Sequence, residues 1–140
     1  MEDLINLLYN CSKKEFKDLI DKLTETNAGI DNTIKLTEQR FGSRYIRTIT
    51  VPKDFVLVGK SHKQLSAWTL LYGEMHTRTE SEVSAILLTD TGAGWNRVDD
   101  RRIGVATKET KWATLHTIPL NLPKGREMDW ILGNLMSVEA

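Results

Sequence analysis

Between Arg44 and Thr117 the chain reads as short extended segments separated by turns, with no helix-length pattern among them. In an extended conformation, one face of residues 45–51 carries Tyr45, Arg47, Ile49 and Val51. The pattern predicts strands over residues 45–51, 55–60, 67–72, 74–79, 83–88, 101–106 and 111–117. Strands spaced roughly 8–12 residues apart, without helices between them, are typical of a β-sandwich or barrel rather than a parallel α/β sheet.

Turn residues separate these predicted strands. Pro52 ends the first strand, because proline fixes its φ angle and has no N–H for a ladder. Gly73 is expected to close a hairpin between residues 67–72 and 74–79. Residues 91–94, which contain two glycines, are expected to form a loop, and without a strand–helix context they do not predict a phosphate-binding motif.

Helical patterns precede the strands. Leu4, Ile5, Leu7 and Leu8 indicate a short amphipathic helix that ends near Asn10. Ser12 and Glu15 have the spacing of a capping box, and the helix that follows places Phe16, Leu19, Ile20 and Leu23 in one apolar stripe. A third helix is expected over residues 31–40, with Gly42 as its C-terminal stop.

After the strands, Pro119 and Pro123 end the β-region, and a short C-terminal helix is expected. Its apolar stripe is Met128, Ile131, Leu132 and Leu135. The chain is therefore divided into an N-terminal helical segment (1–43), a β-barrel (44–118) and a C-terminal tail (119–140). The helices either pack on the barrel or serve as a handle for assembly.

Composition narrows the functional classes. The 140 residues include nineteen basic and nineteen acidic side chains, so no global charge favours nucleic acid or an anionic membrane. No segment has the roughly 18–20 consecutive apolar residues of a membrane span, and the acidic start, Met1-Glu2-Asp3, does not resemble a signal peptide. The single cysteine, Cys11, excludes an intramolecular disulfide and fits a reducing cytoplasm.

Several segments of the β-region resemble the cupins, which are double-stranded jelly-roll barrels, and in particular small cupin-like proteins of bacteriophages. The matching segments are residues 47–52 (RTITVP), 56–63 (VLVGKSHK), 70–73 (LLYG), 102–104 (RIG) and 109–117 (ETKWATLHT). They cover about half of the chain. The resemblance implies a single cupin-like jelly roll, flanked by the helices at each end, acting in the cytoplasm of an infected cell.

The same resemblance places the usual cupin metal ligands, and this sequence departs from them. Counting back from Gly73, the first three ligand positions fall on Lys60, His62 and Ser66, and a later one falls near Arg102. Only His62 is a metal-binding residue type, because lysine and arginine repel a divalent cation. The resemblance therefore implies a cupin that has lost the usual metal site, although it keeps His116 in the last strand.

Strand parity suggests a different interior. Lys60 and His62 share one face, and Trp112 and His116 share another, so these residues and Arg102 can meet inside a jelly roll. Cationic donors beside an indole ring suit a small anionic ligand with a flat group. Alternatively, Lys60 and Arg102 extend to the barrel mouth and Trp112 is an ordinary core residue.

A metal site is a second interpretation of the histidines. His62 and His116, joined by Glu74 or His76, would supply three ligands for a divalent metal that polarises a substrate oxygen. Glu74 and His76 are two residues apart and so share a strand face. No cofactor is favoured in the main interpretation, in which the metal is absent.

Three functional classes follow from these patterns. The preferred one is a non-catalytic cupin-like phage protein that binds a small polar or anionic ligand, or a host protein. The others are a metal-dependent cupin enzyme acting on a small oxygenated substrate, and a phage structural or assembly protein. Cupins commonly pair through strand exchange or sheet packing, so the resemblance also implies a homo-oligomer, most simply a dimer.

Overall fold

The computed structural model describes residues 2–26, 34–59 and 61–134. In chain order its elements are α1 (Glu2–Asn10), α2 (Lys13–Thr26), β1 (Lys35–Phe41), β2 (Arg44–Val51), β3 (Val56–Val58), β4 (Ser66–Tyr72), β5 (Glu74–Thr79), β6 (Ile86–Thr89), β7 (Gly92–Asn96), β8 (Arg102–Ala106), β9 (Thr110–Thr117) and α3 (Glu127–Asn134). Among these residues, no helix is long and apolar enough to cross a membrane.

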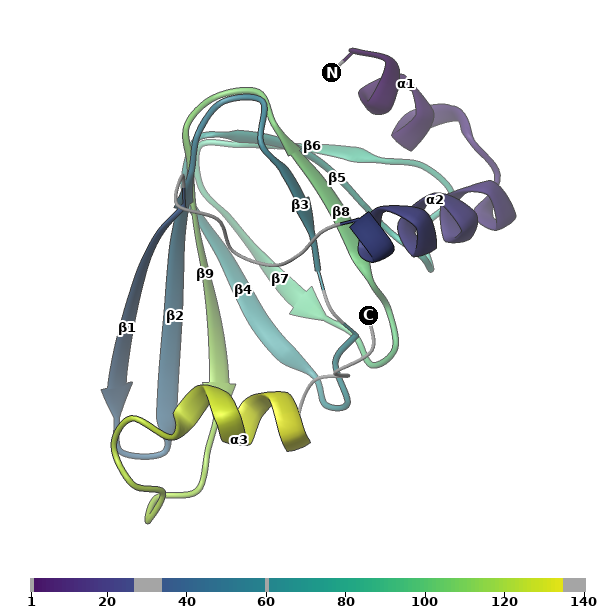
Figure 1. Cartoon of the computed structure of the whole chain (residues 1–140). Coiled ribbons are helices and arrows are strands. Elements are labelled where there is room, and N and C mark those ends of the chain that lie inside the picture. The colour runs from purple at the N-terminus through teal and green to yellow at the C-terminus, as the bar shows by residue number, and fades with distance from the viewer. Residues whose placement is uncertain (1, 27–33, 60, 135–140) are drawn as a thin grey trace.

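Two antiparallel sheets face each other, with strand orders β1-β2-β9-β4-β7 and β3-β8-β5-β6 (Figure 1). Consecutive strands such as β4 and β5 belong to different sheets, which is the connectivity of a jelly roll rather than of a meander. The mainly β jelly roll with flanking helices that the sequence predicts is confirmed. Apolar residues from both sheets fill the space between them: Val51, Trp68, Leu70, Met75, Ala106 and Trp112.

The third predicted helix is wrong. Within residues 31–40, which the structure describes from residue 34 onward, β1 forms instead and pairs with β2 over its whole length, from Lys35 opposite Thr50 to Phe41 opposite Arg44. The apolar stripe for a helix here is thin, so the hydrogen bonds of the sheet outweigh local helix propensity. The five-stranded sheet therefore begins within the segment 1–43 that the sequence predicts as helical.

Two turn predictions are also wrong. Residues 91–94, expected to form a loop, lie at the start of β7, which pairs with β4. Gly73 does not close a hairpin, because β4 and β5 lie in different sheets and the chain crosses between them at this residue. Gly73 has φ of 109°, and a Cβ there would lie 2.5 Å from the carbonyl oxygen of Glu109. This corner therefore requires glycine.

The two N-terminal helices cover the outer face of the four-stranded sheet, as Figure 1 shows. The predicted capping box is present: the Glu15 N–H donates to Ser12 Oγ (3.1 Å), and the Ser12 N–H donates to Glu15 Oε1 (2.9 Å). Phe16 and Ile20 of the predicted stripe are buried against Ile103 and Val105 of β8. β8 is thus buried on both faces of this sheet, and the helices complete a second hydrophobic layer.

A fully buried arginine attaches α1 to the sheet. Arg78 of β5 donates through Nη1 to the carbonyl oxygens of Leu8 (3.0 Å) and Cys11 (2.8 Å) and contacts the Cys11 sulfur at 3.2 Å. Its guanidinium carbon lies 4.8 Å from the centre of the Phe16 ring. These carbonyls are at the C-terminal end of α1, where a cation is favoured by the helix dipole.

We expect Arg78→Ala to lower the free energy of unfolding by at least about 3 kcal/mol, because each hydrogen bond to a charged group contributes roughly 1.5–3 kcal/mol and the carbonyls would lose their donor. Urea denaturation followed by tryptophan fluorescence measures the change. Arg44→Ala is the control, since Arg44 is exposed on β2 and its removal should change stability by less than about 0.5 kcal/mol. Equal stability of the two variants would contradict the role of Arg78.

Candidate functional site

The interior of the jelly roll brings together four of the five ligand-binding residues predicted from the sequence. The rings of His62 and His116 are parallel within 6°, with centres 6.1 Å apart. The Arg102 guanidinium carbon lies 5.8 Å from the centre of the Trp112 ring. The fifth residue, Lys60, lies outside the described residues.

Two residues that the sequence analysis did not assign to the site complete it. Trp68 of β4 stacks on Trp112 with ring centres 4.5 Å apart, and Arg102 lies 5.3 Å from the Trp68 ring centre. Arg47 of β2 lies opposite Thr114 of β9, on the face that also carries His116. Strand parity places Arg47 on the same face as the buried Tyr45 and Val51, and this signal would have identified it.

Burial and neighbouring positive charges lower the pKa of both interior histidines. Burial, His62 and Arg47 together lower the pKa of His116 to about 4. Burial and the charge of Arg102 lower the pKa of His62. The neutral form of both imidazoles is therefore favoured.

Several nitrogen atoms in this interior are buried without a hydrogen-bond partner among the described residues. They are Arg47 Nε, Trp68 Nε1, Arg102 Nε and His116 Nδ1. Buried polar atoms in folded proteins are nearly always paired, so four orphans in one region are unusual. Three of them, on the arginines and the tryptophan, can only donate.

Other polar groups of the interior form hydrogen bonds with one another. Arg102 Nη1 donates to Thr77 Oγ1 at 3.0 Å. Asn96 Nδ2 donates to Ser66 Oγ, and that hydroxyl lies 3.2 Å from His62 Nδ1. These bonds hold Arg102 and His62 in place, while Arg102 Nε and His116 Nδ1 have no bond.

Neither interior guanidinium is neutralised by a direct ion pair with another described residue. Burial lowers the pKa of Arg102, and the more distant charges of Glu82 and Asp100 only partly oppose this effect. Both carboxylates accept hydrogen bonds elsewhere, Glu82 from Thr79 and Asp100 from Ser81. The interior therefore has excess positive charge and unused donors, which favours an anion.

The alternative metal ligands do not meet. His76 faces outward to α1, where its Nδ1 lies 2.7 Å from the Tyr9 hydroxyl. Glu74 accepts a 2.7 Å hydrogen bond from Thr107 Oγ1 and lies 3.8 Å from Lys108 Nζ. Across residues 2–26, 34–59 and 61–134 there is no group of three or more His, Cys, Asp or Glu side chains suited to a metal ion. Two histidines beside two guanidiniums do not fit a divalent cation.

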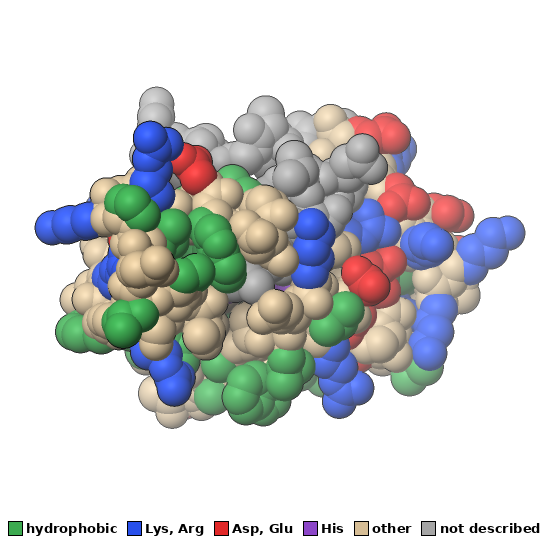
Figure 2. Space-filling model, turned by 90° about the horizontal axis from the view of Figure 1, so that it is seen from below, with side chains coloured by type: hydrophobic (Ala, Val, Ile, Leu, Met, Phe, Trp, Pro, Cys, Tyr) green, Lys and Arg blue, Asp and Glu red, His purple; other side chains and the backbone are tan. Residues whose placement is uncertain are grey.

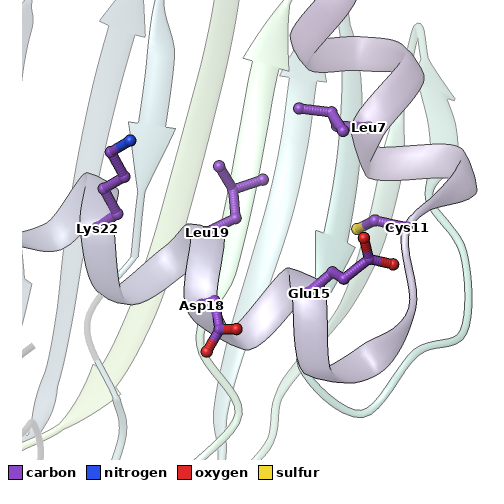
Figure 3. Close-up of a pocket in the computed structure, with 6 residues that line it drawn as sticks. All are labelled: Leu7, Cys11, Glu15, Asp18, Leu19 and Lys22. Carbon is purple, nitrogen blue, oxygen red and sulfur yellow. The ribbon is translucent and has the colours of Figure 1, made fainter.

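A separate pocket lies at the surface between α1 and α2 (Figure 3) and has a volume of about 260 Å³. Its lining consists of Leu7, Cys11, Glu15, Asp18, Leu19 and Lys22. Two leucines face two carboxylates and one lysine there, without the convergent donors of the barrel interior. The chemistry of the interior residues identifies the functional site better than the presence of this pocket does.

Comparisons with known proteins were made at three levels. No protein-family model and no curated protein sequence matches the chain. Solved structures do match. A cupin superfamily protein of Desulfitobacterium hafniense superposes with a TM-score of 0.53 and 10% identity over 69% of this chain and 87% of that one.

Two enzymes superpose in the same way. Ectoine synthase of P. lautus gives a TM-score of 0.56 and 10% identity, over 71% of this chain and 74% of the enzyme. Hydroxypropylphosphonic acid epoxidase of S. wedmorenis gives 0.51 and 13%, over 61% of this chain and 51% of the enzyme. A related structure of the epoxidase carries Fe(II).

The position of the Trp68 ring in the interior depends on a close approach between β7 and β4. Gly94 of β7 lies opposite Trp68, and a Cβ at Gly94 would be 2.6 Å from Trp68 Cζ2. We expect Gly94→Ala to displace the indole and to lower the free energy of unfolding by about 1–3 kcal/mol, as overpacking of a core does. Near-ultraviolet circular dichroism would report the altered Trp68–Trp112 stack.

Gly92→Ala is the matched control, since its Cβ would lie 4.0 Å from the same ring, an ordinary contact. A Gly94→Ala protein with unchanged tryptophan signal and stability would contradict the packing described here.

The lowered histidine pKa values predict a pH dependence of stability. Because His116 titrates near 4 when folded and at its ordinary value of 6.5 when unfolded, the unfolded chain binds more protons between these values. Stability is therefore expected to fall as the pH decreases from about 6.5 to about 4, with each unit of pKa difference corresponding to about 1.4 kcal/mol. Denaturation at several pH values should show a smaller loss for His116→Gln than for the unchanged protein. Equal slopes would contradict the assignment.

A jelly roll of two antiparallel sheets, with cupin structures as its structural matches, is the fold of a cupin.

Proposed function

We propose that this cupin binds a small anionic ligand between its two sheets and holds it by hydrogen bonds rather than through a metal. The observation that carries the proposal is the set of buried, unpaired donors on Arg47, Trp68 and Arg102. An unpaired buried donor costs about 1–3 kcal/mol, and a ligand with anionic oxygens would provide the missing acceptors.

Aromatic side chains lie beside the cationic groups of the interior. Trp68 and Trp112 form a stacked pair, and Arg102 lies over both rings. Aromatic surfaces and cationic donors next to each other suit a ligand that combines a carboxylate or phosphate with an apolar or planar portion. One of the enzymes with a similar fold is named for a phosphonic acid, a compound of the same charge class.

His116 is the group that would respond to an anion. Its Nδ1 is unpaired, and its pKa is held low by burial, His62 and Arg47. A bound anion would counter the positive charges and favour the protonated imidazole, which can donate from both nitrogens. Binding is therefore coupled to proton uptake and strengthens as the pH falls below neutrality.

The role in an infected cell, the host-protein partner and the assembly role stay predictions that rest on the resemblance to phage proteins. The metal-dependent enzyme is the less favoured alternative, because the donor set of the interior does not fit a divalent cation. The metal-dependent enzyme differs from the anion site in what stabilises the folded protein, so one set of measurements separates these two functions.

The test is isothermal calorimetry and thermal unfolding with inorganic phosphate, succinate and benzoate as probes. At least one anion is expected to raise stability, by about 2.7 kcal/mol at a hundredfold excess over its dissociation constant. Arg47→Gln should weaken binding at least about tenfold, since a hydrogen bond to a charged group contributes roughly 1.5–3 kcal/mol. Arg44→Gln, on the same strand but exposed, should bind normally.

A second variant separates binding from folding. Arg102→Met is expected to abolish anion binding while leaving the ligand-free protein as stable as before or more stable, because a buried cation without a counter-ion is costly. Failure of every anion to stabilise the protein would overturn the proposal. Stabilisation by manganese, iron, nickel or zinc that is lost in His62→Ala would support the metal-dependent enzyme instead.

A further inference from the structure

β7 is an edge strand, and no described residue pairs with its outer edge. It is the last strand of its sheet and pairs with β4 on one side only. Within the described part of the chain, its backbone makes no hydrogen bond outside that pairing. Natural edge strands are usually blocked by charged side chains or proline, and β7, with the sequence GAGWN, has neither.

The side chains next to this edge form an apolar surface on the outer face of the sheet. Trp95 is 61% exposed, and Leu65, just before β4, is 57% exposed. Trp95 is in register with Ala67 of β4, which is in register with Leu115 of β9. This apolar row runs to the β7 edge and ends there. An exposed tryptophan at the end of such a row is characteristic of an interface.

Charged residues flank β7 but do not lie on it. Asp90 precedes the strand and Arg97 follows it, and neither forms a salt bridge with another described residue. If two copies of β7 run antiparallel about Gly94, Arg97 of each copy lies opposite Thr91 of the other, so no two like charges are opposed.

The same register matches the sizes of the side chains. Ala93 of one copy lies opposite Trp95 of the other, so a large ring covers a small residue on the outer face. Ala93 and Trp95 have the same strand parity, which places both on the outer side of the joined sheet. Gly94 lies on the two-fold axis, where the backbones approach with no side chain between them.

We propose that β7 pairs antiparallel with β7 of a second copy, about a two-fold axis at Gly94, and joins the two five-stranded sheets into one continuous sheet. The other edges fit this role less well. β1 carries Lys35, Glu38 and Arg40, which protect it. β3 and β6, with three and four residues, are shorter than β7 and offer fewer backbone hydrogen bonds to a partner strand.

The proposed pairing places the dimer interface next to the proposed ligand site of each copy. Gly94 lies opposite Trp68, whose ring forms part of the barrel interior. The dimer does not depend on ligand, because every residue invoked for it lies on the edge or on the outer face of the sheet.

Sedimentation equilibrium over a concentration series tests the proposal. The unchanged protein is expected to have twice the chain mass of 16.0 kDa, and Trp95→Lys to have the mass of one chain with an unchanged far-ultraviolet spectrum. Phe41→Lys on β1 and Ile86→Lys on β6 are the controls, since these side chains are 63% and 44% exposed. Both controls should remain dimers. A monomeric unchanged protein, or dissociation by a control in place of Trp95→Lys, would overturn the proposal.

Cross-linking tests the register independently. Residues 93 and 95 of the two copies face each other in this arrangement, and directly opposed antiparallel residues have Cα separations within the disulfide range. An oxidised mixture of Ala93→Cys and Trp95→Cys proteins should give a covalent dimer containing one chain of each. Neither variant alone should give it in comparable yield. Equal cross-linking in the separate and mixed samples would contradict the Gly94 axis.

Discussion

Arginine side chains attach the helices of this molecule to its sheets, and two others lie in the candidate site. Arg78 binds the carbonyl oxygens at the end of α1, and Arg101 attaches α2 through Asp21 at 2.7 Å and is itself bonded to Glu80. Arg40 of β1 attaches the C-terminal segment through Glu127 at 3.1 Å and the Leu122 carbonyl at 2.6 Å. Each helix is thus fixed to the sheets by one arginine that lies on a strand or directly before it, and charge-assisted hydrogen bonds of this kind have a defined geometry.

These attachments decide between the two roles considered for the helices. α1 and α2 bury Ile103 and Val105, which would otherwise face water on the outer side of the four-stranded sheet. α3 closes one end of the five-stranded sheet, where Ile131 packs against Tyr45 and Ile118. Figure 2 shows that end, with hydrophobic side chains mainly on the side where α3 covers the ends of β1 and β2, and most acidic side chains on the opposite side, where α2 lies. The helices therefore complete the core of the jelly roll, and their removal exposes it.

Local patterns in the sequence predicted the elements that bury one face and expose the other. The capping box and the Phe16–Ile20 stripe predicted α2, and alternation predicted β2, because in both cases one face is buried. β1 was missed because most of its side chains are exposed, and β7 was missed because it pairs with β4, which is distant in sequence. Parity grouped Trp112 with His116, and Arg47 shares the parity of Tyr45 and Val51. Trp68 joins them only through the register of β4 with β9, which depends on long-range pairing.

The resemblance to cupins placed a metal-ligand position near Arg102, so this chain has a guanidinium where a cupin would have a metal ligand. This difference has chemical consequences for a bound ligand. A divalent cation and a guanidinium both bring positive charge into a jelly-roll interior, but they act differently on a ligand. A metal with an open coordination position polarises an oxygen that it binds, and so lowers barriers to reaction. A guanidinium donates hydrogen bonds in a fixed plane and retains its proton, which orients an anion without activating it. If the interior binds an anion as we propose, Arg102 and Arg47 would orient that anion without activating it.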